Sequence, residues 1–375
     1  MDNIRLINLS HSKKFANFLE CVKEIPDPRI QKRVTHSLTN IVVIIVFASI
    51  SGANNNVAFE EYGIFHAEEL ATIIDLSKGV PSHDTFLRAL KFIDQRFLSF
   101  WTSLWQDEFI AKYDTKQIAF DGKEDKANNY GFVRAWDVEN KMAIETRYIP
   151  SETNEIPVAH DVLKSIKLKN IVVTSDAMHA QKNNARLIIE QGGDYVFILK
   201  GNQHQFYKDI VLFVDDIFAN GVVGLDYDMW TTQEKGHGRI EKRTCIATSS
   251  IKWLYQRREW KGIRSIGVIK STRIVKGKIQ SEKRYFITSL KDDAESIMMR
   301  IRNHWSIENH CHRNLDTNFD SDRLAIRDVV AAQNMAIIKN LALSIIINYD
   351  PQASIRRLRS QAAFRFDSLM EMMAT

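Results

Sequence analysis

The spacing of apolar residues divides the chain into a helical first part and a mixed second part. Before about residue 110, apolar side chains recur at three- and four-residue intervals, for example from Phe15 to Val22 and from Phe86 to Ile93. This period is typical of amphipathic helices that bury one face. A Ser and an Asp stand before the second stretch, where they can accept hydrogen bonds from the free N–H groups of a helix start. We therefore predict an all-α N-terminal domain over residues 1–112.

From Gln117 the pattern changes to short strands that alternate with helices. The expected strands are 118–121, 131–138, 142–149, 171–177 and 194–200, and the expected helices are 155–166 and a second one that ends before Gly192 and Gly193. A hairpin followed by alternating helices and strands predicts a mixed sheet with helices packed on its faces. The fold class expected for the whole chain is therefore α/β, preceded by the all-α domain.

Residues 201–290 interrupt this alternation with further β-type segments, which predicts a β-rich insertion. After the insertion, helices are expected over about 293–312 and about 329–346. We assign 113–350 to one catalytic domain that carries the insertion, and 351–375 to a basic C-terminal tail.

The composition indicates a folded protein without a membrane span. Among 375 residues, 45% are hydrophobic and only 6 are Pro and 15 are Gly, so no long flexible linker is expected. The longest apolar run, Ile41–Ile50, is about half of the roughly 20 residues needed to cross a bilayer. The N-terminus lacks the features of a secretory signal, and the three cysteines are far apart. We expect a cytoplasmic protein with no membrane partner.

The positive charge is concentrated in one segment. Residues 235–284 hold fifteen Lys or Arg against three Glu, a net +12, whereas the whole chain carries only +5. The rest of the chain is therefore acidic, and this segment is polarised toward a polyanionic partner such as a nucleic acid. A solvated strand face is the alternative explanation.

Three carboxylates have the placement that metal-ion chemistry requires. Asp121 ends the first predicted strand, Asp176 ends the fourth, and Glu308 lies on a later helix. The carboxyl ends of neighbouring strands meet at one rim of an α/β sheet, so the two Asp side chains can share a cation. Mg²⁺ favours such oxygen ligands, and Mn²⁺ could substitute. Any one of these acids could instead cap a strand end.

Six segments carry a family resemblance: IAFDGK, VVTSDAM, GGDYVFILKGNQ, HGRIEKR, RYFITSL and HWSIEN. In this order they resemble the bacterial DDE transposases of the H-repeat-associated insertion-sequence family. The similarity extends from about Leu38 to beyond Asn340. A single such segment is common in unrelated proteins, but the ordered set is specific.

The resemblance implies an RNase-H-like fold with a β-rich insertion between the second and third acids. It implies that Asp121, Asp176 and Glu308 form a catalytic DDE triad that binds Mg²⁺. The implied activity is cleavage and strand transfer at terminal inverted repeats, with water and then a 3′-hydroxyl as nucleophiles. The implied partners are double-stranded DNA and further copies of the chain, in a nucleoid-associated assembly without a small-molecule substrate.

The chain departs from the family pattern near the third acid. Related transposases have a basic residue four positions before the Glu, where this chain has His304, and a Lys seven positions after it, where Leu315 stands. Part of the family's charged pattern is also missing between Asp320 and Arg327. Two alternatives therefore stay open, a decayed or domesticated DNA-binding descendant and a nuclease or resolvase that cuts without joining.

Further residues are candidates for DNA contact. They are Lys123, Lys200, Asn202, His237, Arg239, His304 and Trp305. Trp305 could stack on a base or pack in the core, residues 200–203 could bind phosphate or form a turn, and residues 237–239 could form a tight hairpin. His310 and His312 point to different faces of a regular helix, so a zinc site is not favoured.

Overall fold

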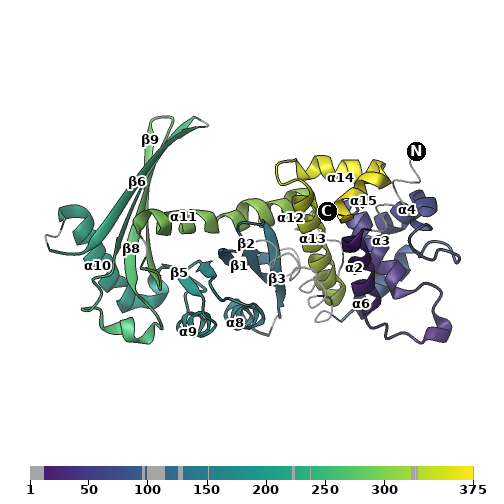
Figure 1. Cartoon of the computed structure of the whole chain (residues 1–375), viewed down its shortest axis with the longest axis horizontal. Coiled ribbons are helices and arrows are strands. Elements are labelled where there is room, and N and C mark those ends of the chain that lie inside the picture. The colour runs from purple at the N-terminus through teal and green to yellow at the C-terminus, as the bar shows by residue number, and fades with distance from the viewer. Residues whose placement is uncertain are drawn as a thin grey trace.

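The computed structural model describes residues 12–94, 98, 115–125, 130–150, 152–221, 224–236, 238–291, 293–321, 326 and 328–374. Figure 1 shows an elongated molecule with a helical body at one end, a sheet in the middle and projecting strands at the other end. Some predictions from the sequence concern residues 95–97, 99–114, 237, 322–325 and 327, which lie outside the described residues.

One nine-stranded sheet runs through the α/β part, in the order β3-β2-β1-β4-β5-β9-β8-β7-β6. Its first five strands are β1 (Gln117–Asp125), β2 (Tyr130–Asp137), β3 (Met142–Ile149), β4 (Val172–Ser175) and β5 (Asp194–Leu199). Strand β2 is antiparallel to both β1 and β3, and β1, β4 and β5 are parallel. The expected mixed, RNase-H-like sheet is confirmed.

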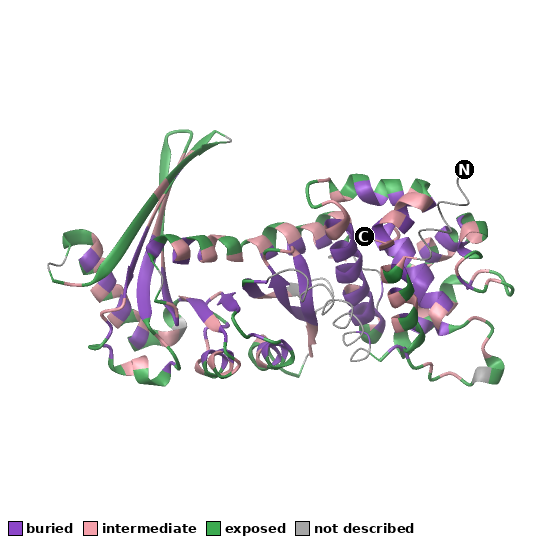
Figure 2. Ribbon diagram, in the orientation of Figure 1, coloured by how far each residue is buried: buried purple, intermediate pink, exposed green. Residues whose placement is uncertain are grey.

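The insertion continues this sheet instead of forming a separate layer. It contains β6 (Tyr227–Gly236), β7 (Arg239–Thr248), β8 (Ser265–Val275) and β9 (Lys278–Thr288), together with α10 (His204–Asn220) and short turns at Gly201–Gln203 and Tyr255–Glu259. Strand β9 pairs antiparallel with β5 over Val196–Leu199. The far ends of β6–β9 project from the body as exposed strands (Figure 2).

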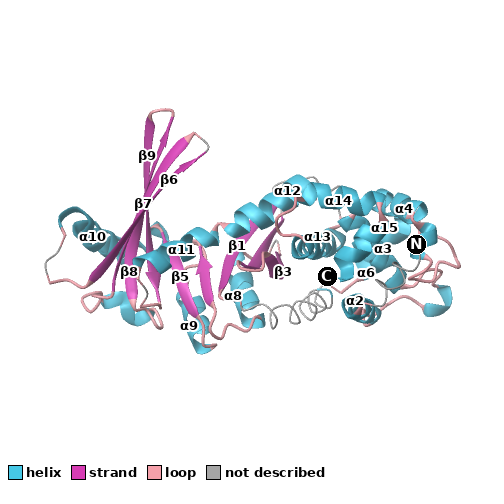
Figure 3. Cartoon of the chain, turned by 45° about the horizontal axis from the view of Figure 1, so that its top comes forward, coloured by secondary structure: helices cyan, strands magenta, loops and turns pink. Residues whose placement is uncertain are grey.

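Helices cover both faces of the sheet. On one face lie α8 (Glu155–Ser165) and α9 (Lys182–Glu190), which pack on alternate residues of β1 and β5 such as Phe120 and Tyr195. On the other face, α11 (Ala294–His304), a π-helical turn at Ile307–His312 and α12 (Arg313–Asn318) follow one another along the sheet (Figure 3). Gln117 holds α11 in place, because its Nε2 donates to the Arg300 carbonyl at 2.8 Å.

Both ends of the chain build the helical body. It contains α2 (Lys13–Lys23), α3 (Leu38–Ile50), α4 (Asn56–Phe65), α5 (Ala67–Leu70) and α6 (His83–Phe92) from the N-terminal part, and α13 (Val329–Tyr349), α14 (Ile355–Phe364) and α15 (Phe366–Ala374) from the C-terminal part. Helix α13 is long and apolar enough to cross a membrane, but 89% of its apolar window is buried inside the protein, where it packs on α3, α6 and β3.

The C-terminal segment differs from the basic tail expected at 351–375. Phe366, Leu369 and Met370 are buried in the same core cluster as α3 and α13. Arg359 is also buried, and its Nη2 donates to the Ser49 carbonyl at 2.9 Å. Because this guanidinium satisfies a carbonyl near the end of α3, Arg359 serves the packing of the helical body, whereas Arg356 and Arg357 are exposed. Helices α14 and α15 pack with the N-terminal helices α3 and α2.

Candidate active site

Strand register brings the two predicted aspartates to the same rim of the sheet. In the parallel pairing of β1 with β4, Phe120 lies opposite Ser175. The next residues are Asp121, which lies within β1, and Asp176, which directly follows the end of β4, so both carboxylates lie at the rim where the parallel pairing of β1 with β4 ends. Asp176 follows the end of its strand as predicted, whereas β1 continues past Asp121 to Asp125 through its pairing with β2, so Asp121 lies inside its strand and not at its end.

The third acid reaches this rim from the helix that crosses the sheet. Glu308 lies in the π-helical turn Ile307–His312, which widens the helix between α11 and α12. One side-chain atom each from Asp121, Glu308 and His312 lie within 4.8 Å of one another, and so do atoms from Asp121, Asp176 and His179. Asp121 therefore lies at the centre of two overlapping sets, and the three predicted acids are brought together around it.

The clustered carboxylates perturb each other's protonation. Burial, together with the negative charges of Glu308 and Asp176, raises the pKa of Asp121 far above its ordinary value. A hydrogen bond from His312 lowers the pKa of Glu308. Burial and the neighbouring charges therefore favour the protonated form of Asp121, and a bound cation would favour release of that proton.

A cavity of about 510 Å³ opens beside the acids. It is lined by Gly122, Lys123, Glu155, Met178, Glu308, His312, Arg313, Asp316 and Thr317. Lys123 and Asp316 form an ion pair across it. The Glu308 side chain is 57% exposed and lines this cavity, whereas the Asp121 side chain behind it is only 14% exposed.

Comparisons with known proteins identify the family. The model of the family described as "Transposase DDE domain" matches residues 110–345, and one described as "DDE_Tnp_1-associated" matches residues 19–105. The chain belongs to the DDE transposase family. The three acids and the predicted resemblance both fall within the matched range.

Several relatives and one solved structure are similar to this transposase. YbfL of Escherichia coli (strain K12) is 31% identical, and the H repeat-associated protein YhhI of the same organism is 30% identical; each match covers 96% of this chain and 98% of the relative. The resemblance to H-repeat-associated transposases is confirmed. The protein named "Inactive transposase YbfQ" is 33% identical over 20% of this chain and 92% of its own length. A chain of the piggyBac transposase synaptic complex with hairpin DNA superposes with a TM-score of 0.42 at 10% identity, covering 98% of this chain and 80% of that chain.

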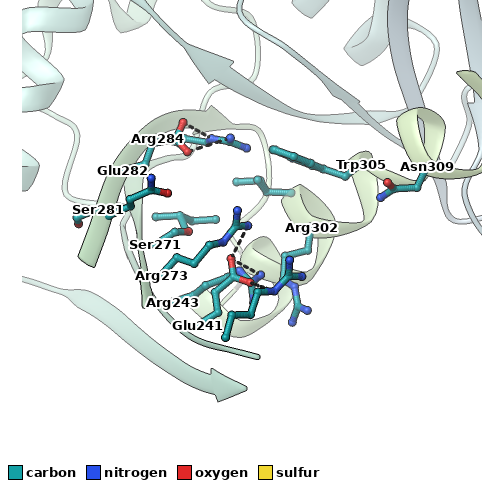
Figure 4. A pocket seen from close by; sticks show the side chains of 14 residues that line it. Glu241, Arg243, Ser271, Arg273, Ser281, Glu282, Arg284, Arg302, Trp305 and Asn309 are labelled. Carbon is teal, nitrogen blue, oxygen red and sulfur yellow. Dashed lines mark hydrogen bonds and ion pairs between the residues drawn. The ribbon is translucent and has the colours of Figure 1, made fainter. Parts of the chain in front are cut away.

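A second, basic groove of about 550 Å³ lies between the insertion strands and α11 of this transposase (Figure 4). Its lining includes Arg239, Glu241, Arg243, Ser271, Arg273, Gln280, Ser281, Glu282, Arg284, Arg302, Trp305 and Asn309. Glu241 lies 2.7 Å from Arg243 and 3.3 Å from Arg273, so it holds both guanidinium groups in place. We call this surface the arginine groove.

Trp305 lines the arginine groove (Figure 4). Its side chain is 45% exposed, and the Arg284 guanidinium lies 4.3 Å from the centre of its ring. Trp305 is therefore not packed in the core, which was the alternative that the sequence left open. The Arg284 cation covers one face of the ring and so holds the ring in position. Trp305 lies three residues before Glu308 on the same helical path.

The remaining predicted DNA contacts are scattered. Lys200 is exposed just after β5, Asn202 lies in the turn that follows it, and Arg239 lines the arginine groove. His304 lies against the sheet, with Nδ1 3.1 Å from Thr174 Oγ1. Burial lowers the pKa of His304 to about 4, so this ring is neutral at pH 7 and offers a hydrogen bond instead of a positive charge. His237 lies outside the described residues.

Sequence reasoning did not single out three residues at the acid cluster. His312 was set aside because its spacing from His310 does not suit a shared metal, but it stands four residues after Glu308, and its Nδ1 lies 3.4 Å from Glu308 Oε2. His179 lies in the turn between β4 and α9, and Glu155 is the first residue of α8. His179 Nε2 and Glu155 Oε1 lie 2.5 Å apart. The absence of a side chain at Gly122 makes room for Glu155, because an added Cβ at Gly122 would lie 1.7 Å from a Glu155 carboxylate oxygen.

Proposed function

We propose that this transposase cleaves DNA at the terminal inverted repeats of its element and transfers the freed 3′ end to target DNA. The catalytic groups are Asp121, Asp176 and Glu308. The observation that carries the proposal is their convergence: two adjacent strands and a distant helix contribute three carboxylates to one cluster, and Glu308 of that cluster lines an open cavity. A purely structural role would not require like charges to gather at an accessible surface.

The donor set fits divalent cations. Carboxylate oxygens are the ligands that Mg²⁺ and Mn²⁺ prefer, and the mutual repulsion that raises the pKa of Asp121 is relieved when a cation lies among the acids. In the two-ion chemistry of phosphoryl transfer, such cations stabilise the attacking and leaving oxygens. The chain's own part is to hold its carboxylates rigidly, and Asp176 does so by accepting a hydrogen bond from the Met178 N–H at 3.0 Å.

The arginine groove supplies a DNA-binding surface that leads to the acids. Its guanidinium groups can contact phosphates, and the exposed face of Trp305 can stack on a base. Because Trp305 and Glu308 belong to one helical path, a strand in the groove is held at a fixed distance from the catalytic rim. Double-stranded DNA is thus the proposed partner, and Lys123, Lys200 and Arg239 are proposed phosphate contacts.

The remaining parts of the proposal follow from the family. Transposases act on paired ends, so we propose that this chain works as a homo-oligomer assembled on DNA in the bacterial cytoplasm. A basic surface of this kind also implies binding that weakens steeply with salt.

A second candidate is a transposase-derived DNA-binding protein that has lost its chemistry. It is favoured by Leu315, which is buried where related proteins carry a Lys, and by the existence of a relative named as inactive. The intact acid cluster argues for activity. A nuclease that cuts without joining differs from both the transposase and the inactive DNA-binding protein, because it would give cleaved DNA without joined products.

The deciding experiment uses labelled duplex DNA that carries the element's own end. Wild-type protein, Asp121→Ala and the matched control Asp161→Ala, an exposed acid on α8, are each incubated with Mg²⁺ or with EDTA. We expect Mg²⁺-dependent nicking and joined products from the wild type and the control and neither from Asp121→Ala. Specific binding without cutting would favour the decayed protein, and cutting without joined products would favour the nuclease.

A further inference from the structure

Two imidazoles accompany the acids, one on each side of Asp121. His312 groups with Asp121 and Glu308, and His179 groups with Asp121 and Asp176. Both rings are almost completely buried, at 4% and 1% exposure. Each half of the cluster therefore offers two carboxylates and one ring nitrogen.

The spacing around His312 suits a shared cation. Its Nδ1 lies 3.4 Å from Glu308 Oε2 and 3.8 Å from Asp121 Oδ2. Ligand atoms that are each about 2.1 Å from one ion lie about 3.0–3.5 Å from one another, so only a small adjustment would place all three on one ion. Among the described residues its Nε2 makes no hydrogen bond, so no contact of that kind ties the ring down in another direction.

His179 is held in place from two sides. Its ring meets the Phe120 ring edge-on at 5.0 Å between centroids, and its Nε2 lies 2.5 Å from Glu155 Oε1. Neither ring nitrogen makes a hydrogen bond of normal geometry within the described part of the chain. A histidine that binds a metal usually gives its other N–H to a carboxylate, which orients the ring. Glu155 is placed to do this, and Gly122 leaves the space that its carboxylate occupies.

We infer that His312 and His179 are nitrogen ligands of the catalytic cations, one on each side of the bridging Asp121, with Glu155 as the residue that positions His179. This inference rests on the proposed metal-dependent function. Imidazole binds Mn²⁺ more readily than Mg²⁺, which favours oxygen. The centre therefore discriminates between the two ions more strongly than three carboxylates alone would.

The first test detects the nitrogen directly. Mn²⁺ is added to the full-length wild-type chain without DNA, and pulsed electron paramagnetic resonance records whether the bound ion couples to ¹⁴N. We expect nitrogen coupling from bound Mn²⁺. Mn²⁺ that binds without any nitrogen coupling would overturn the inference, and this result needs no variant to fold.

Variants then assign the coupling to residues. His312→Gln and His179→Gln are compared with His310→Gln, a matched control on the same helical path that belongs to neither ligand set. Each ligand variant is expected to lose part of the nitrogen signal and to weaken Mn²⁺ binding at least about tenfold, with a smaller loss for Mg²⁺. Glu155→Gln should weaken Mn²⁺ binding while the coupling from His312 stays. Equal Mn²⁺ and Mg²⁺ losses in all variants, including the control, would contradict the assignment.

Asp121→Asn separates this inference from the proposed function. If Mn²⁺ binding depends on Asp121 but shows no nitrogen coupling, the metal-dependent function stands and only the nitrogen ligands are refuted. If Mn²⁺ binding is unchanged in Asp121→Asn, the acid cluster is not the metal site, and the proposed function fails with it. Circular dichroism of each variant confirms that the fold is retained.

Discussion

The arginine groove should account for a measurable share of the salt dependence of DNA binding. Its lining holds five arginines against two glutamates, a net charge of +3, and Glu234 outside the lining pairs with Arg243 and Arg302. Arg239, Arg273 and Arg284 have side chains that are 46%, 45% and 30% exposed, so they are available to phosphates. We expect the triple replacement of these three by Gln to weaken binding and to flatten its dependence on salt.

The magnitude follows from counterion release. Each phosphate neutralised by a basic side chain contributes about 0.9 to the slope of log K against log salt concentration, so three contacts contribute about 2.7. Over a fourfold increase in salt, for example from about 50 to about 200 mM, this share of the slope corresponds to a loss of about 40-fold in affinity. The triple variant should not show this share, about 40-fold, of the salt-dependent loss of affinity. Phosphate contacts made elsewhere on the protein should keep their own contribution to the slope.

The assay is fluorescence anisotropy with a labelled duplex of the element's end at four or more salt concentrations. A matched control replaces the exposed lysines Lys164, Lys167 and Lys169 by Gln, at the opposite end of β4 from the acids. The control should keep the wild-type slope. An unchanged slope in the arginine variant, or an equal change in the control, would refute the groove as the DNA surface.

Three further outcomes are expected. Gly122→Ala should displace the Glu155 carboxylate, because the new Cβ would lie 1.7 Å from it, and so weaken Mn²⁺ binding about 10- to 100-fold in calorimetry with little change in melting temperature; unaltered binding would contradict this. Lys339→Met should lower the free energy of unfolding by about 1–3 kcal/mol in urea titrations, because Nζ donates to the Phe319 carbonyl at 2.7 Å; a neutral result would mean that the bond contributes nothing. Mg²⁺ binding at pH 7 should release about one proton, because the raised pKa of Asp121 keeps it protonated in the free protein, and Mg²⁺ affinity should fall as pH falls; calorimetry in buffers of different ionisation heat would show zero release if this is mistaken.

Controls for these outcomes lie in the same chain. Gly236→Ala adds a Cβ that meets no atom within 4 Å, so it should leave metal binding and melting temperature unchanged. For the proton release, Asp161→Ala should leave the number of protons unchanged, because this exposed acid lies outside both ligand sets.

Local patterns in the sequence decided the order of the elements and the identity of the acids. Period-two and period-three-to-four apolar spacing predicts β1–β5 and the helices between them, because each element buries one face against the same sheet. The same pattern predicted that Asp121 and Asp176 lie at one rim, since parallel neighbours meet there, although β1 continues past Asp121 to Asp125. The charge of residues 235–284 likewise predicted a basic surface, and the arginine groove draws its lining from that range and from α11.

Only the tertiary structure decided how distant segments combine. The pairing of β9 with β5 joins the insertion to the main sheet, and α14 and α15 pack into the helical body, because edge strands and apolar helix faces find partners that are far away in sequence. His312 stands four residues after Glu308, a spacing that brings the two side chains together on a helix, but only the packing of this turn against β1 adds Asp121 to the pair. The sequence alone thus determined which acids are the candidate ligands and which elements carry them. Packing between elements determined which imidazoles lie beside these acids.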